Sequence, residues 1–113
     1  MKILLDECVP IQVRSALPGH DVYSATDSQW RGLSNGELLH LAVQQGFDVF
    51  VVADKNMRYQ QDLSDRRIAV LELWTNHRPT LERHFQYISA AVERMASGQY
   101  FELTAPVSFP RNR

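Results

Sequence analysis

The sequence predicts a three-layer α/β domain with a mostly parallel central sheet of four to five strands. Short aliphatic runs recur along the chain and stop at polar residues, which is typical of strands buried on both faces. Stretches with apolar residues at helical spacing separate these runs. Because right-handed crossovers bring the carboxyl ends of parallel strands to one edge, that edge is where a ligand site is expected.

The elements are expected in a regular order. Strands are predicted at residues 3–5, 21–24, 48–53, 68–73 and, at an edge of the sheet, 100–104. Helices are predicted at residues 11–17, 34–45 and 79–97, the last being the longest, with a short helix or irregular turn at 57–63. The 113 residues then form one domain over residues 1–105, followed by a mobile C-terminal tail at 106–113.

Two of the predicted strands end at acidic residues. Asp6 follows the first strand and Asp54 follows the third, so both carboxylates are expected at the carboxyl edge of the sheet. Clustered carboxylates repel one another unless a cation neutralises them, and oxygen ligands suit Mg²⁺ or Mn²⁺. Glu7 and Asn56 are further candidate ligands, although Glu7 alternates to the other side from Asp6 and Asn56 fits ordinary turn chemistry.

Glu37 is the third candidate ligand, and it has a second interpretation. Ser34 and Glu37 match the capping-box pattern, in which each side chain accepts a hydrogen bond from a backbone N–H of the first turn. A side chain turned back to cap its helix does not also hold a metal. The sequence by itself leaves the cap and the ligand equally open.

Composition gives the remaining limits. The formal net charge is −1, so any polyanion has to be bound by a local patch or through a metal. The single cysteine, Cys8, excludes an intramolecular disulfide and is expected in the core. Because no signal peptide or membrane span is visible, a soluble, cytoplasmic protein without membrane contact is expected. The four histidines show no zinc-ligand spacing.

Four motifs together resemble small bacterial PIN-like proteins, similar to the toxins of toxin–antitoxin pairs. They are KILLDE at 2–7, GHDV at 19–22, GLSNGELL at 32–39 and VVADKN at 51–56. The resemblance implies a PIN-like fold and metal-dependent ribonuclease chemistry. It also implies that Asp6, Glu37 and Asp54 are the catalytic, metal-binding acids, with Mg²⁺ or Mn²⁺ as the cofactor.

The resemblance further implies partners. Single-stranded RNA is the expected substrate, with Lys55, Arg58 and Arg31 placed to meet its phosphates. An antitoxin protein is the expected regulator, and a homodimer stays open. Because Asn35 and Asn56 stand where the family often has acids, a PIN-like module that only binds a protein partner is the alternative. A receiver-like domain, with Asp54 as phospho-acceptor, ranks third because no lysine follows Lys55.

Overall fold

A computed structural model describes residues 1–27, 30–53 and 67–106 of the chain. Within these ranges the structure contains a five-stranded sheet in the order β2-β1-β3-β4-β5, and every neighbouring pair of strands is parallel. The strands are β1 (Lys2–Leu5), β2 (Asp21–Ser24), β3 (Val49–Val52), β4 (Ala69–Glu72) and β5 (Tyr100–Glu102). The predicted α/β class, the parallel sheet and the edge position of the last strand are therefore confirmed.

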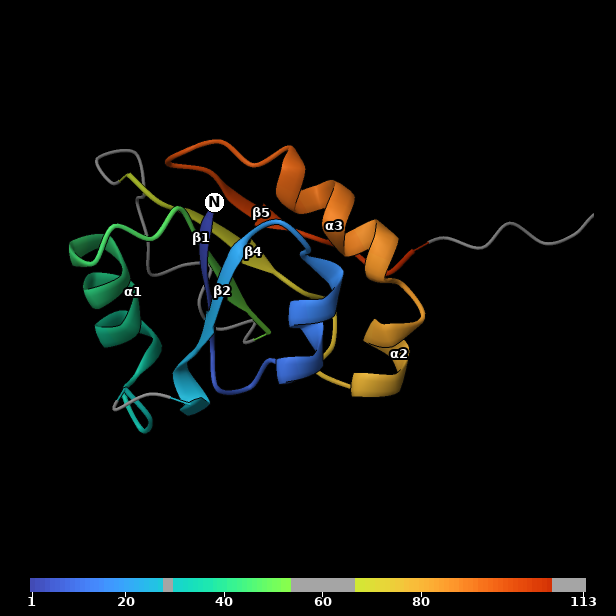
Figure 1. Ribbon diagram of the computed structural model, residues 1–113, viewed down its shortest axis with the longest axis horizontal. Helices are drawn as coiled ribbons and strands as arrows, with labels where there is room; N and C mark the ends of the chain where they lie inside the picture. The colour runs from blue at the N-terminus through green and yellow to red at the C-terminus, as the bar shows by residue number, and fades with distance from the viewer. Residues whose placement is uncertain (28–29, 54–66, 107–113) are drawn as a thin grey trace, which may run out of the picture.

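Helices cover both faces of this sheet (Figure 1). The 3₁₀ helices are η1 (Ile11–Ala16) and η2 (Ala25–Asp27), and the α-helices are α1 (Asn35–Gln44), α2 (Arg78–Glu82) and α3 (Phe85–Glu93). Helix α1 lies on one side of the sheet, whereas η1, α2 and α3 lie on the other, which gives three layers. In the described ranges, every helix is too short or too polar to cross a membrane.

The core consists of two apolar layers, one on each face of the sheet. Alternate residues of a strand point to opposite faces, so each strand contributes to both layers. One layer joins the sheet to η1, α2 and α3 through Ile3, Leu5, Val51, Leu71, Val13, Leu81, Ile88 and Val92. The other joins it to α1 through Leu4, Phe50, Val52, Val70, Leu38, Leu39 and Ala42.

The predicted long helix at residues 79–97 is wrong, because the structure divides it. Helix α2 ends at Glu82 and α3 begins at Phe85, since His84 has φ −126° and ψ 30°, outside the helical region. The turn brings the ring of His84 to 5.9 Å from that of Trp74, and the ring of Tyr87 lies 5.6 Å from the same indole. The helix is therefore interrupted between α2 and α3 at the point where His84 and Tyr87 pack against Trp74, although the apolar stripe continues through the break.

The predicted burial of Cys8 is wrong, whereas the predicted packing of Trp30 and Leu33 against the core is confirmed. Cys8 is exposed rather than part of the core, because β1 ends at Leu5 and the chain turns outward. Trp30 and Leu33, in the connection before α1, are partly buried against the layer that contains α1, and the Trp30 ring lies 6.0 Å from that of Phe47. The connection is therefore packed against the core before the helix begins.

Lys2 links the start of β1 to the end of α1. Its Nζ donates to the carbonyl of Gln45 at 2.8 Å and lies 4.6 Å from the centre of the Phe47 ring. A cation favours the negative end of a helix dipole, so this contact stabilises the C-terminus of α1 beside the amino edge of the sheet. The opposite end of α1, which carries Glu37, is thereby directed along the strands toward their carboxyl ends.

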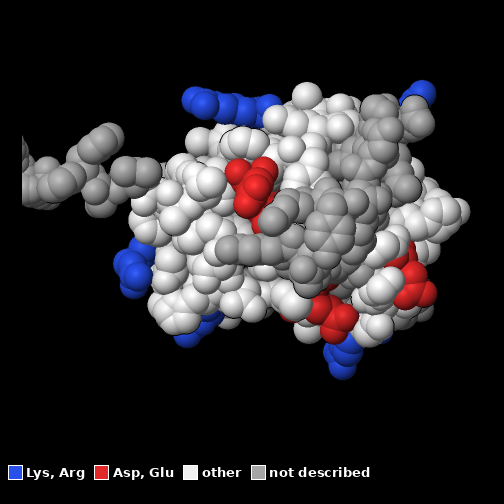
Figure 2. Space-filling model, turned by 180° about the vertical axis from the view of Figure 1, so that it is seen from behind, with Lys and Arg blue, Asp and Glu red and all other residues white. Residues whose placement is uncertain are grey.

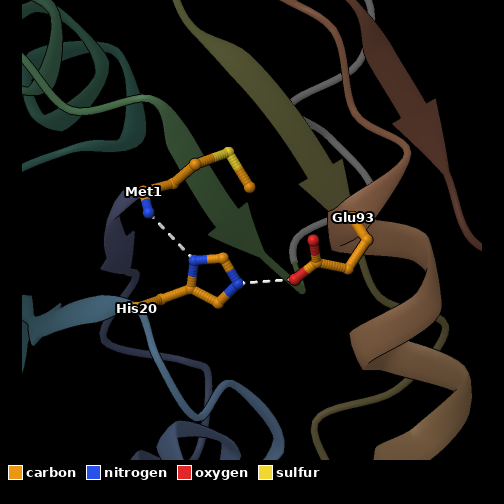
Figure 3. A network of polar contacts seen from close by, with 3 residues as sticks. All are labelled: Met1, His20 and Glu93. Atoms are coloured by element: carbon orange, nitrogen blue, oxygen red, sulfur yellow. Dashed lines mark hydrogen bonds and ion pairs between the residues drawn. The ribbon is translucent and has the colours of Figure 1, made fainter.

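A second polar network joins the first strands to α3 (Figure 3). His20 lies between the amino group of Met1, which is 3.0 Å from Nδ1, and the carboxylate of Glu93, whose Oε2 is 2.6 Å from Nε2. With the ring proton on Nε2, the ammonium donates to Nδ1 and the ring donates to Glu93. The His20 side chain is only 12 % exposed, whereas the Glu93 side chain is 59 % exposed, so the imidazole is the shielded part of this bridge.

We expect His20→Ala to lower the free energy of unfolding by about 1 kcal/mol, because it removes both polar contacts. The comparison is Arg78→Ala, which removes an exposed pair with Glu82 at 3.4 Å and should cost less than about 0.5 kcal/mol. Urea denaturation of the three proteins measures both values. Equal and small changes in the two variants would show that the His20 network contributes nothing beyond a surface pair.

Candidate functional site

Asp6 lies directly after β1, at the carboxyl edge of the sheet. Its backbone N–H donates to the carbonyl of Val51 at 3.0 Å, so the ladder between β1 and β3 continues to this residue. The whole residue is 3 % exposed, and its Oδ2 accepts a hydrogen bond from the Cys8 N–H at 3.3 Å. A carboxylate is costly to bury, so its position in a rigid turn indicates a constraint beyond packing.

The register of the strands places further acids level with Asp6. Leu5 pairs with Val51, so Asp6, one residue later, is level with Val52. Val52 pairs with Glu72 on β4, and Glu72 pairs with Glu102 on β5. Two strand spacings therefore separate the Cα atoms of Asp6 and Glu72, about 10 Å.

Glu72 is a buried acid that the sequence prediction missed. It is 1 % exposed, and its Oε1 accepts a hydrogen bond from the Tyr100 hydroxyl at 2.5 Å. Its Oε2 is buried without a hydrogen-bond partner among the described residues. Leaving such an atom unmatched costs about 1–3 kcal/mol. The available signal was a charged residue between Leu71 and Leu73, inside a run expected to be buried on both faces.

Glu37 forms the capping box at the start of α1. Its Oε1 accepts from the Ser34 N–H at 2.9 Å, and the Ser34 hydroxyl accepts from the Glu37 N–H at 3.2 Å. These backbone and side-chain hydrogen bonds to Ser34 hold the pKa of the Glu37 carboxyl below its ordinary value, despite a small opposing effect of desolvation. The capping interpretation is therefore observed, and Oε2 is the oxygen that remains for any further ligand.

Glu7 and Arg31 both contact the connection that precedes α1. Oε1 of the exposed Glu7 accepts from the N–H of Gly32 at 2.6 Å, where the glycine adopts φ +88°. The Arg31 side chain donates through Nε and Nη2 to the carbonyl of Thr26, at 3.3 and 2.9 Å. Glu7 thus links the turn after β1 to this connection by a hydrogen bond. The Arg31 guanidinium is held at the surface by its two hydrogen bonds to Thr26.

The other predicted site residues, Asp54, Asn56, Lys55 and Arg58, lie outside the described residues. Within the ranges that the structure does describe, no three His, Cys, Asp or Glu side chains gather as metal ligands. Asp6 nevertheless fits a hard divalent cation by its chemistry, because it offers a buried carboxylate at the carboxyl edge of the sheet. The remaining positions on such an ion are commonly filled by water or phosphate.

On one face of the molecule, the charged side chains of the described residues are dispersed. Figure 2 shows this face, on which Lys and Arg side chains lie around the outline and acidic side chains form separate patches. On this face the described cations therefore offer separate contacts to a polyanion.

We expect Glu37→Gln to keep the capping hydrogen bonds but to remove their dependence on pH. Because the folded-state pKa of Glu37 is lowered, its ionic contribution is complete above the ordinary value of 4.5 and is lost as the pH falls through the folded-state pKa. The melting temperatures of wild type and variant should differ at neutral pH and converge in acid.

Thermal scans from neutral pH into acid measure this convergence. Ser34→Ala is the control, since it removes a cap and should lower stability by about 1 kcal/mol at pH 7. A difference in melting temperature between wild type and Glu37→Gln that stays constant with pH would contradict the lowered pKa assigned to Glu37.

Comparison with known proteins identifies no family for the chain. No protein-family model, no curated protein and no solved structure matches it. The resemblance to PIN-like proteins therefore stays a prediction from sequence motifs.

Proposed function

We propose that this protein is a metal-dependent ribonuclease that hydrolyses phosphodiester bonds of single-stranded RNA at the carboxyl edge of its sheet. The observation that supports this proposal best is the buried carboxylate of Asp6, held immediately after a central strand of a parallel sheet. In parallel α/β sheets this edge is where ligands bind. The motif resemblance adds the toxin role, with an antitoxin protein as its regulator.

Asp6, Glu37 and Asp54 would hold Mg²⁺ or Mn²⁺ in this site. Such an ion lowers the pKa of a bound water and neutralises charge on the scissile phosphate. Asp6 contributes a carboxylate whose position is fixed by the Cys8 N–H, so little entropy is lost when it binds a cation. Glu37 contributes Oε2 while Oε1 stays in the capping box, and its lowered pKa keeps the carboxylate ionised.

The decisive test combines metal binding with RNA cleavage. Wild type should bind Mn²⁺ in titration calorimetry and cleave a mixed single-stranded RNA pool only when Mn²⁺ or Mg²⁺ is present. Asp6→Asn keeps the shape of the side chain and its contact with Cys8, but it should weaken Mn²⁺ binding and lower cleavage at least about a hundredfold.

Asp21→Asn is the matched control, because Asp21 is an exposed acid at the start of β2, at the opposite edge of the sheet, and its loss should leave cleavage within about threefold of wild type. Addition of EDTA gives the metal-free background. Cleavage that persists in Asp6→Asn and in EDTA would point to a contaminating nuclease, and an inactive wild type would reject the proposed reaction.

A second candidate function is binding of a protein partner, and the edge strand β5 favours it. Phe101 on this strand is 38 % exposed. Beside it, a cavity of about 490 Å³ lies between α3 and β5 and is lined mainly by apolar side chains, among them Tyr87, Met95 and Leu103. An extended peptide can add to such an edge strand while its side chains enter an apolar groove.

We expect Phe101→Asp to abolish binding of the product of a neighbouring antitoxin-like reading frame, because it places a charge at the centre of this apolar surface. Tyr23→Asp is the matched control, since Tyr23 is 45 % exposed on β2, the opposite edge strand. Size-exclusion chromatography of the coexpressed proteins measures complex formation. Loss of the complex in both variants, or in neither, would reject the β5 edge as the binding surface.

A further inference from the structure

We infer that the groove between α3 and β5 binds an extended segment of a partner protein, with a carboxylate of that segment on Arg94. The carboxylate lies two residues from an apolar side chain of the same segment. This inference rests on the second candidate function, binding of a protein partner at β5, and adds the chemistry of that partner. The groove is the cavity of about 490 Å³ beside β5, and among the described residues that line it Arg94 is the one with a charge.

The backbone of β5 offers hydrogen bonds to such a segment. β5 is the last strand in the sheet order, and its neighbour among the described residues is β4. The Leu103 N–H donates to the carbonyl of Glu72, and the Gln99 carbonyl accepts from the N–H of Val70, so residues 99 and 103 bond toward β4. Because this direction alternates along a strand, Glu102 directs its N–H and C=O away from β4. An added strand can pair with these groups.

The apolar part of the groove has room for side chains of an added strand. Phe101 and Leu103 alternate with Tyr100 along β5, and Tyr100 packs with the α1 layer, so Phe101 lies on the α3 face. On the helix, Ala90 and Ala91 line the cavity with single methyl groups, which leaves space beside β5. Phe101 is 38 % exposed, so covering its ring with an apolar side chain is favourable.

Arg94 lies at one end of the groove, where α3 turns into β5. The connection is tight, because the Ala96 N–H donates to Oε1 of Gln99 and the Gln99 N–H donates to the Ala96 carbonyl, both at 3.0 Å. The end of α3 therefore lies beside the start of β5 (Figure 1). Among the described residues, the exposed Arg94 has no hydrogen-bond or ion-pair partner for its guanidinium. The neighbouring acid, Glu93, is paired with His20, so a bound partner is the source of a carboxylate for Arg94.

The spacing along the groove determines the chemistry of the segment. Ala90 and Arg94 are four residues apart, about 6 Å along the axis of α3. Side chains on one face of an extended strand recur every two residues, about 7 Å. An apolar side chain beside Ala90 therefore places the side chain two residues away next to Arg94. A carboxylate at that position forms a charge-assisted hydrogen bond with the guanidinium.

A second copy of this chain fits the groove less well than an acidic partner. If two β5 strands paired edge to edge, the row facing α3 would supply Gln99, Phe101 and Leu103. None of these three residues is an acid, and Glu102 alternates to the other face, so Arg94 would stay without a counter-charge. Complementary charge therefore favours a different protein as the occupant.

Three synthetic peptides test the inference. Each alternates threonine with the residues under test, which are glutamate, leucine and glutamate in the first peptide. The second has glutamines and the third has lysines in place of the glutamates, and the two flanking positions serve both directions of an added strand. Titration of ¹⁵N-labelled protein gives each Kd and locates the amides that shift. We expect the glutamate peptide to bind about tenfold more tightly than the glutamine peptide and to shift amides of α3 and β5.

Variants at two arginines assign this preference to a residue. Arg94→Glu should reverse it, so that the lysine peptide binds more tightly than the glutamate peptide. Arg94→Gln should remove it, and this milder variant keeps the test valid if charge reversal at the end of α3 unfolds the helix. Arg83→Glu is the matched control, because Arg83 is also exposed and without a described partner but lies outside the cavity lining. It should leave the preference within about twofold of the wild-type value.

The outcomes separate this inference from the function on which it rests. Equal affinities for the glutamate and glutamine peptides, with shifts at β5, would overturn the role of Arg94 and leave β5 as a binding surface. An equal loss of preference in Arg94→Glu and Arg83→Glu would show general charge attraction and would also overturn it. No shift at β5 with any peptide would overturn the inference together with the second candidate function. A wild type that is dimeric in size-exclusion chromatography until Phe101→Asp is introduced would assign the groove to a second copy and overturn the inference.

Discussion

Burial of the central strands on both faces is the constraint on which the rest of the structure depends. β1, β3 and β4 lie inside the sheet, and apolar layers cover both of its sides. Polar side chains are costly within these strands, so they are expected where the strands end. Asp6 follows this rule at the end of β1, and Glu72 is the last residue of β4. The same constraint that builds the core therefore concentrates chemistry at one edge.

Much of the fold could be predicted because its signals are local. Strand runs, the capping box at Ser34 and the packing of Trp30 each depend on residues close in the sequence. The break between α2 and α3 could not be predicted, since the apolar stripe continues through it and the interruption involves Trp74, which lies outside the helical stretch. The exposure of Cys8 was missed for a related reason, because residue type gives its average burial rather than the direction of a turn.

The candidate site was predicted only in part. Asp6 could be found because it interrupts an aliphatic run at a strand end, and the structure places it at the expected edge. Glu37 carried two interpretations, and the hydrogen bonds to Ser34 show the cap without excluding its second oxygen from another role. Glu72 was missed because the strand was predicted to continue to residue 73, so this acid did not stand at a predicted strand end. Only the register across three strands shows that it is level with Asp6.

The order of strands also determines when each part of the chain can fold. β1 pairs with β2 on one side and with β3 on the other, so β1 completes its hydrogen bonds only after residue 51 has been synthesised. Parallel pairs need long connections, and contacts between distant residues form slowly. Until then, one edge of an aliphatic strand is open to pairing with other chains. Nascent chains that stop before β3 are therefore the ones that we expect to aggregate or to need a chaperone.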